Sequence, residues 1–242
     1  AMIDQPFYVI NGKNVVPNMG STIIPPCTGV MVQATDNGQS VTFTKTTAQQ
    51  SSQPSQLQIM LSQVVEPVET PSLRGTKQSS TVDKAIVSFN ESDKLEKFHF
   101  GDNAKLYIPQ GGKDFAIAFS EGQGEIPLNF KATKNGTYTI TVNPEGVNLA
   151  YLHLIDNMTG ADVDLLTPAG VPPLQWGQGG FNYTFTAKTT DYESRFRLVF
   201  ICGDANGDNE DAPFAYYANG EIIVFADTGN ASLQVIDVMG RD

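Results

Sequence analysis

Cysteine, histidine, tryptophan and positive charge are scarce in this sequence. Its 242 residues include two cysteines, two histidines and one tryptophan, and 26 Asp and Glu outnumber 15 Lys and Arg. The formal net charge of -11 repels nucleic-acid phosphates and anionic lipid headgroups. We therefore expect no nucleic-acid binding. We also expect no membrane insertion, because no apolar run reaches the roughly 20 residues that span a bilayer.

The few cysteines and histidines form no recognisable reactive site. Cys27 and Cys202 belong to no CxxC or Cys/His cluster, which excludes a zinc or thioredoxin-type site. One disulfide in an oxidising compartment and two buried thiols are both compatible with them. His99 and His153 stand between apolar neighbours, so we interpret both as residues on strand faces. No GxSxG, HExxH or phosphate-loop motif is present, and the sequence therefore predicts no enzyme.

Hydrophobic residues alternate with small or polar residues through much of the chain. Successive side chains of a strand point to opposite faces, so this period of two indicates half-buried β-strands. Asn-Gly, Gly-Gly and similar pairs separate the strand-like segments, as tight hairpin turns require. The clearest predicted strands are residues 6–10, 56–61, 115–119, 137–142, 181–188, 195–200, 221–225 and 231–238.

These strands predict an all-β fold, an antiparallel β-sandwich with a jelly roll as one form of it, plus a short C-terminal β-unit. The sandwich covers residues 1–202, with mobile loops near 46–55 and 66–81 where the periodicity stops. An acidic linker, 203–213, leads to the β-unit at 214–242. Helix is expected at most as a short turn near Asp83 or Ser92. Both chain ends fall in strand-like sequence, which suggests a fragment of a longer polypeptide.

Several phrases of the sequence, taken in order, are similar to one family. They are residues 24–32, 136–142, 151–160, 163–166, 183–187 and 195–200. Together they resemble the C-terminal β-sandwich region of large secreted surface proteins of Bacteroidales-type bacteria. In that family a small β-domain that serves as a type IX secretion sorting signal commonly follows, and residues 220–241 resemble its first part. The resemblance implies an extracellular, cell-surface location and carries over no catalytic motif.

Residues 167–180 stand where this family usually makes a short turn, and they contain the single tryptophan. A tryptophan on a Gly- and Gln-rich loop can stack on the C–H face of a sugar, because those C–H groups meet the π cloud. The residues that such a contact would use are Trp176, Gln175, Gln178 and Phe181. Alternatively, Trp176 folds back over a sheet edge and closes the core.

The acidic linker contains half of a calcium-binding motif. Asp204, Asn206 and Asp208 place oxygen atoms at positions one, three and five of a turn, which suits Ca²⁺. Glu210 or Asp211 can add a further ligand if the loop curls. The twelfth position, where an EF-hand-like loop needs a carboxylate, is Ala215. A calcium site and a plain solvated linker both remain compatible with this segment.

Taken together, the sequence favours a non-catalytic structural or adhesive module of a secreted bacterial cell-surface protein. Its partner is expected to be another surface protein or a glycan. The alternative is a carbohydrate-binding module that uses the aromatic loop around Trp176. We expect a monomer that requires no cofactor, with calcium as the ion for which the sequence offers ligands.

Overall fold

The computed structural model describes residues 3, 5–11, 14–20, 23–34, 36–44, 55–65, 78–166, 181–203, 214–218, 220–225, 234 and 236. Every regular element within them is a β-strand, so the predicted all-β class is confirmed. In these ranges the chain contains no helix of the length and apolarity needed to span a bilayer.

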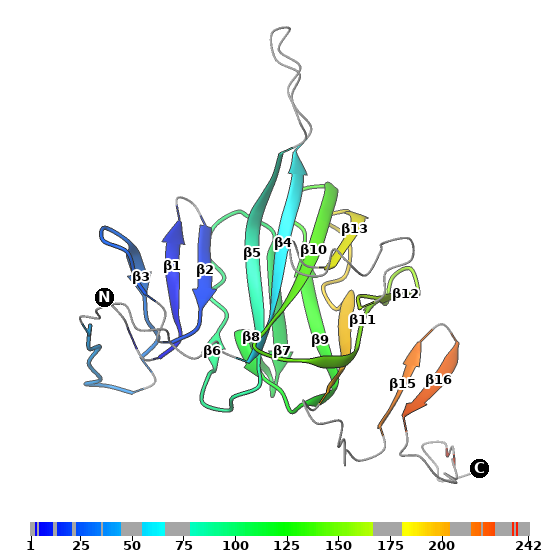
Figure 1. The fold of residues 1–242 in the computed structure, drawn as a ribbon. Coiled ribbons are helices and arrows are strands. Elements are labelled where there is room, and N and C mark those ends of the chain that lie inside the picture. Colours follow the sequence, from blue (N-terminus) through cyan, green and yellow to red (C-terminus); the bar gives the residue numbers. More distant parts are fainter. Residues whose placement is uncertain are drawn as a thin grey trace, which may run out of the picture.

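Most strands belong to one large sheet that folds over itself into two layers (Figure 1). One layer consists of β7 (Lys105–Gln110), β9 (Gln123–Lys131), β14 (Phe196–Cys202), β11 (Leu149–Asp156) and β12 (Ala161–Asp164). The other consists of β8 (Lys113–Phe119), β5 (Gln78–Ser88), β4 (Gln56–Val65), β10 (Gly136–Glu145) and β13 (Phe181–Ala187). Strand β6 (Leu95–Glu96) pairs with β8.

The sheet passes from one layer to the other along β7. The first half of this strand, up to Tyr107, pairs with β9, and the second half, from Ile108, pairs with β8. The β7–β8 hairpin then closes through Gly111 and Gly112, which have φ values of +58° and +78°. Glycine adopts this left-handed conformation without a steric penalty, so the Gly-Gly turn signal of the sequence corresponds to a real hairpin.

Side chains of the two layers meet in one hydrophobic core. The ring of Phe130 on β9 contacts Tyr138 on β10 and Phe185 on β13, at centroid distances of 5.1 and 5.2 Å. Neither β10 nor β13 is next to β9 in the sheet, so these contacts cross between layers. Edge-to-face rings at this spacing stabilise the core beyond the burial of their area. This packing makes the folded sheet a sandwich.

Strands β5 and β8 depart from the predicted antiparallel arrangement. They run parallel, with Ile86 beside Ile117 and Ser88 beside Phe119. Parallel neighbours need a crossover connection rather than a hairpin, and residues 89–112, which contain β6 and β7, supply it. Alternation along single strands contains no information about this crossover.

Two local expectations are wrong. Asp83 lies within β5 and Ser92 lies in a turn, so neither begins a helix. The predicted loop near 66–81 ends earlier than expected, because β5 begins at Gln78 and its polar start pairs with Val64 and Val65 of β4. The first residues of β5 show no alternation of apolar and polar side chains, because there β4 and β5 extend as a two-stranded ribbon beyond the core. Residues 46–54 and 66–77 lie outside the described ranges.

The N-terminal segment forms a separate sheet beside the sandwich, drawn in blue in Figure 1. Its strands are β1 (Phe7–Asn11), β2 (Asn14–Asn18) and β3 (Gly29–Met31), in the order β2-β1-β3. Tyr8 and Met19 of this segment pack with Ile86, Leu95 and Ile117 in a second hydrophobic cluster. The small sheet therefore covers the outer face of β5 and β8.

The first part of the C-terminal β-unit is a hairpin of β15 (Phe214–Ala218) and β16 (Glu221–Phe225). Tyr216 is buried in a third cluster with Ile155 of β11 and Val199 of β14. Arg197 of β14 also donates a hydrogen bond to the carbonyl of Tyr217. The hairpin thus packs on the outer face of the β11–β14 layer. Residues 226–242, apart from 234 and 236, lie outside the described ranges.

Lys84 places an amino group in the seam between the N-terminal sheet and the sandwich. The residue is 8% exposed, and its Nζ donates to Asn18 Oδ1 at 3.3 Å. Burial lowers its pKa from 10.5 to about 8, against the opposing effect of Glu145. A pKa lowered by folding means that the folded state binds the proton less tightly than the unfolded chain. Stability should therefore rise with pH between about 8 and 10.5.

We expect Lys84→Met to raise the free energy of unfolding at pH 7. The lowered pKa corresponds to a penalty of about 3 kcal/mol for the buried ammonium, at about 1.4 kcal/mol per unit, and the lost Asn18 contact offsets part of the gain. The advantage of the variant should shrink above pH 8. Urea unfolding at pH 7 and pH 10 measures both values, with the exposed Lys113→Met as control. An equal difference at the two pH values would contradict the prediction.

Candidate functional site

Two phenylalanines lie on the surface just after β6. Phe98 is 44% exposed and Phe100 is 62% exposed. Their rings stack with centroids 5.8 Å apart and 23° between the planes. Two rings in full face-to-face contact would be about 3.5–4.0 Å apart, so Phe98 and Phe100 do not cover each other fully. We call Phe98 and Phe100 the aromatic pair.

A tight turn at His99 sets the geometry of the aromatic pair. The N–H of Phe100 donates to the carbonyl of Phe98 at 3.0 Å, which closes a three-residue turn. Lys105 Nζ donates to the carbonyl of Phe100. The His99 side chain points to a different contact, with its Nε2 2.9 Å from Asp114 Oδ2. The backbone that carries both rings is therefore fixed at each residue.

A buried ion pair anchors the start of this segment. Lys97 Nζ lies 2.8 and 2.7 Å from the two carboxylate oxygens of Asp83, and the side chains are 2% and 5% exposed. Burial lowers the pKa of Lys97, and the Asp83 carboxylate opposes that shift. Asp83 also accepts the backbone N–H of Leu106 at 2.7 Å. The ion pair thus ties residues 97–100 to β5 and β7.

Asp83 reaches Lys97 because β5 bulges at this point. Leu61 of β4 pairs with Asp83, but the next residue, Ser62, pairs with Thr81. The extra residue disturbs the ladder locally, and bulges of this kind redirect side chains. The buried carboxylate of Asp83 on β5 therefore has a defined position and a partner, Lys97.

The N-terminal sheet holds the segment from its other side. The Tyr8 hydroxyl donates to the carbonyl of Glu96 and accepts the N–H of Phe98 at 3.0 Å. Burial raises the pKa of Tyr8 well above its ordinary value, although the hydrogen bond from Phe98 opposes the shift. The phenol therefore stays protonated at neutral pH and keeps both hydrogen bonds. The Tyr8 ring also lies 6.4 Å from that of Phe98.

Side chains of opposite charge border the aromatic pair. Lys113 forms an ion pair with Glu96, and their side chains are 63% and 41% exposed. His99 and Asp114 form the other pair, with side chains 44% and 40% exposed. Exposed hydrogen-bond donors and acceptors thus accompany the two exposed phenylalanines.

A second polar group continues this border along β7 and β9. Tyr107 donates to Glu193, which also pairs with Lys131 at 2.7 Å. The hydrogen bonds from Lys131 and Tyr107 lower the pKa of Glu193, so the carboxylate stays ionised. Burial and the Glu193 contact raise the pKa of Tyr107 to about 12. The Tyr107 ring meets His99 edge-on at 5.2 Å, which joins the two polar groups.

Most residues of the two predicted binding loops lie outside the described ranges. They are Trp176, Gln175, Gln178, Asp204, Asn206, Asp208 and Glu210. Phe181 is described: it opens β13, pairs with Val142 and is half-buried against the main core. In the described residues no group of three His, Cys, Asp or Glu side chains could hold a metal ion.

The cysteines and histidines take up contacts that the sequence only partly predicts. Cys27 is exposed and Cys202 is half-buried, and no disulfide joins the two. His153 lies on β11 as predicted, where its Nδ1 is 2.6 Å from Asp162 Oδ1 on β12. His99 does not lie on a strand, because β6 ends at Glu96. Both histidines therefore connect neighbouring elements through a carboxylate.

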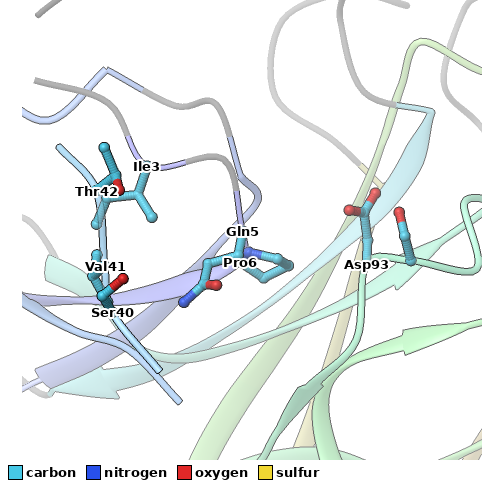
Figure 2. A pocket seen from close by; sticks show the side chains of 8 residues that line it. Ile3, Gln5, Pro6, Ser40, Val41, Thr42 and Asp93 are labelled. Atoms are coloured by element: carbon cyan, nitrogen blue, oxygen red, sulfur yellow. The ribbon is translucent and has the colours of Figure 1, made fainter. Parts of the chain in front are cut away.

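Two open hollows border the N-terminal sheet. The first has a volume of about 400 Å³ and the second, between β1 and residues 23–28, about 370 Å³. In Figure 2 Asp93 faces the first hollow from one side, and Gln5, Pro6 and residues 40–42 face it from the other. Asp93 accepts a hydrogen bond from Ser88 Oγ at 3.3 Å. The described residues that line this first hollow therefore include one carboxylate and no nucleophile paired with a base.

No protein-family model matches the chain, and neither does any curated protein or solved structure. The surface side chains of the chain itself therefore provide the basis for proposing a function.

The aromatic pair escapes prediction from the sequence. In residues 97–100 the period of two places both phenylalanines on one face, which predicts a buried face with Lys97 and His99 outside. In the structure both phenylalanines are exposed and Lys97 is buried by its bond to Asp83, whereas His99 is exposed as the pattern predicts. Two signals point to this outcome: an acidic residue just before the apolar residues 85–87, and the turn sequence 101–103 directly after the phenylalanines.

Proposed function

We propose that this chain is a non-catalytic adhesive module of a secreted bacterial cell-surface protein. The aromatic pair is the observation that supports this function most. Phe98 and Phe100 stay exposed although their backbone is held by Tyr8, Lys105 and the Asp83–Lys97 ion pair. A surface that is ordered before it meets a ligand loses little conformational entropy on binding. The cell-surface location rests on the family resemblance of residues 24–32, 136–142, 151–160, 163–166, 183–187 and 195–200.

The polar contacts of the chain agree with a structural use of its reactive side chains. His153 joins β11 to β12 through Asp162, and His99 joins the aromatic pair to β8 through Asp114. Glu193 links Tyr107 and Lys131 across β7 and β9. In an adhesive module these groups serve the rigidity of the scaffold and contact with a ligand rather than catalysis.

Retention under flow tests the proposed adhesion. Beads coated with the full 242-residue chain should stay longer than albumin-coated beads on a surface coated with mucin, collagen or cellulose. Phe98→Ser/Phe100→Ser should remove the excess retention. Phe43→Ser, at a phenylalanine that is 56% exposed elsewhere on the surface, is the matched control. Equal retention of chain-coated and albumin-coated beads on all three surfaces would contradict adhesion.

A second candidate is a carbohydrate-binding module that uses the loop of Trp176, Gln175, Gln178 and Phe181. Exposed rings bordered by polar side chains favour this class, since sugars present both C–H and O–H groups. The candidate predicts that Trp176→Ala abolishes sugar binding by the chain. Comparing millimolar calcium with a chelator in the same assay tests the loop from Asp204 to Glu210.

A further inference from the structure

We propose that the aromatic pair, Phe98 and Phe100, binds the C–H face of a neutral pyranose sugar. The hydroxyl groups of that sugar would meet the His99–Asp114 and Lys113–Glu96 pairs at the border. This inference rests on the proposed function and adds the class of ligand and the place where it binds. It is distinct from the Trp176 loop, which belongs to another part of the chain.

The ring geometry suits a sugar. The face of an aromatic ring is negative, and the C–H groups on one face of a pyranose approach it with their positive ends. The rings of Phe98 and Phe100 are nearly parallel, at 23°, with centroids 5.8 Å apart. Phe98 is 44% exposed and Phe100 is 62% exposed, so each residue keeps surface that a sugar can cover.

The exposed area suits a small ligand better than a protein. A fully enclosed phenylalanine buries about 150–250 Å². The exposed fractions of Phe98 and Phe100, 44% and 62%, together amount to about one such residue. A stable protein interface needs about 800 Å² from each partner, with an apolar centre. Glu96 and His99 flank Phe98 in the chain and are bonded to Lys113 and Asp114, so polar side chains accompany the pair.

The charges favour a neutral sugar. Lys113 is bonded to Glu96, His99 is bonded to Asp114, and the Lys105 ammonium donates to the carbonyl of Phe100. Lys113, Glu96, His99 and Asp114 together offer no surplus positive charge for a sulfate or a uronate, and Lys105 is already bonded to the backbone. The net charge of -11 also repels polyanionic glycans at longer range. A carboxylate accepts up to about four hydrogen bonds, so Asp114 can bond sugar hydroxyls while it holds His99.

A glycan array on the full chain tests the proposal, with neutral and acidic glycans printed side by side. We expect binding to neutral glycans that becomes roughly tenfold weaker or more in Phe98→Ala and in Phe100→Ala. Phe100→Leu should weaken binding as well, because leucine keeps apolar volume but has no π face. Phe98→Tyr should bind, since it keeps the ring. Phe43→Ala and Trp176→Ala should bind like the unchanged chain.

Each contrary result has a different meaning. Binding lost in Trp176→Ala but kept in both alanine variants of the pair would overturn the site and leave adhesion standing. Binding that tolerates Phe100→Leu would indicate plain apolar contact and overturn the sugar stacking. A blank array together with bead retention on collagen would overturn the ligand class and favour a protein partner. Thermal unfolding of each variant shows that a loss of binding is not a loss of fold.

Discussion

Replacing Asp156 with Ala is expected to lower the free energy of unfolding by about 3 kcal/mol, the lower end of the range for breaking a buried ion pair. Arg195 Nε and Nη2 donate to the two oxygens of Asp156 at 3.0 and 2.8 Å. The side chains of Arg195 and Asp156 are 3% and 0% exposed. Without Asp156 the guanidinium would keep Asp191, at 3.5 Å, as its remaining carboxylate among the described residues.

Asp156 contacts several elements of the large sheet, so its removal should destabilise the whole sandwich. Its carboxylate also accepts the N–H of Met158 at 3.0 Å and the hydroxyl of Tyr183 at 3.1 Å. Met158 belongs to the turn between β11 and β12, whereas Tyr183 lies on β13. Strands β12 and β13 are the two ends of the large sheet, so one carboxylate links the edges of both layers. Asp156→Asn keeps the shape and should cost less than the alanine.

The same carboxylate predicts a dependence on acid. Burial alone would raise the pKa of Asp156, but hydrogen bonds from Arg195, Met158 and Tyr183, with the charge of Arg195, hold it below its ordinary value of 3.8. A pKa lowered by folding gives stability that is present above about pH 4 and is lost as the pH falls below it. Urea unfolding followed by circular dichroism at pH 7 and pH 3 should therefore show a smaller gap between wild type and Asp156→Ala at pH 3. A constant gap would contradict this role.

The sequence predicts the strands of this fold better than their arrangement. Strands β8, β10, β13 and β14 appear where residues alternate, because burial of one sheet face acts on each strand separately. The parallel pairing of β5 with β8 depends instead on a crossover through residues 89–112, which no local pattern encodes. Asp83 is a similar case, since its bulge and its partner Lys97 become apparent only once β4, β5 and the segment after β6 come together.

The candidate site was harder to predict for the same reason. A pattern of alternating residues predicts which face is apolar and does not predict which face is buried. In residues 97–100 the ion pair determines that Lys97 is buried and the phenylalanines are exposed. Leaving the buried Asp83 carboxylate unpaired would cost several kcal/mol, and this cost exceeds the gain of about 1.5–3 kcal/mol from burying one ring. The loops of Trp176 and Asp204 lie outside the described ranges, and the binding sites expected there remain predictions.

Lys97→Ala should destabilise the chain by about 3–5 kcal/mol although Lys97 lies beneath the aromatic pair and touches no ligand. The substitution leaves the Asp83 carboxylate, 5% exposed, with backbone N–H donors from Leu106 and Lys84 and without its cation. It also removes the anchor at the start of residues 97–100. Urea unfolding and the flow assay should both report the loss. Lys94→Ala, at an exposed lysine three residues earlier, is the control.

The double variant Asp83→Leu/Lys97→Met separates the charge of this pair from its packing. Apolar side chains of similar volume often replace a buried ion pair without loss of stability, so most of the free energy should return. Residues 97–100 can be ordered by packing alone or by the hydrogen bonds from Lys97 to Asp83, and the bead retention of the double variant distinguishes these two cases. If packing alone orders residues 97–100, the double variant should also recover bead retention. If it is stable but no longer retained, the directed hydrogen bonds from Lys97 to Asp83 are what position Phe98 and Phe100. A single variant Lys97→Ala that unfolds like wild type would exclude both cases and leave Tyr8 as the principal support of the pair.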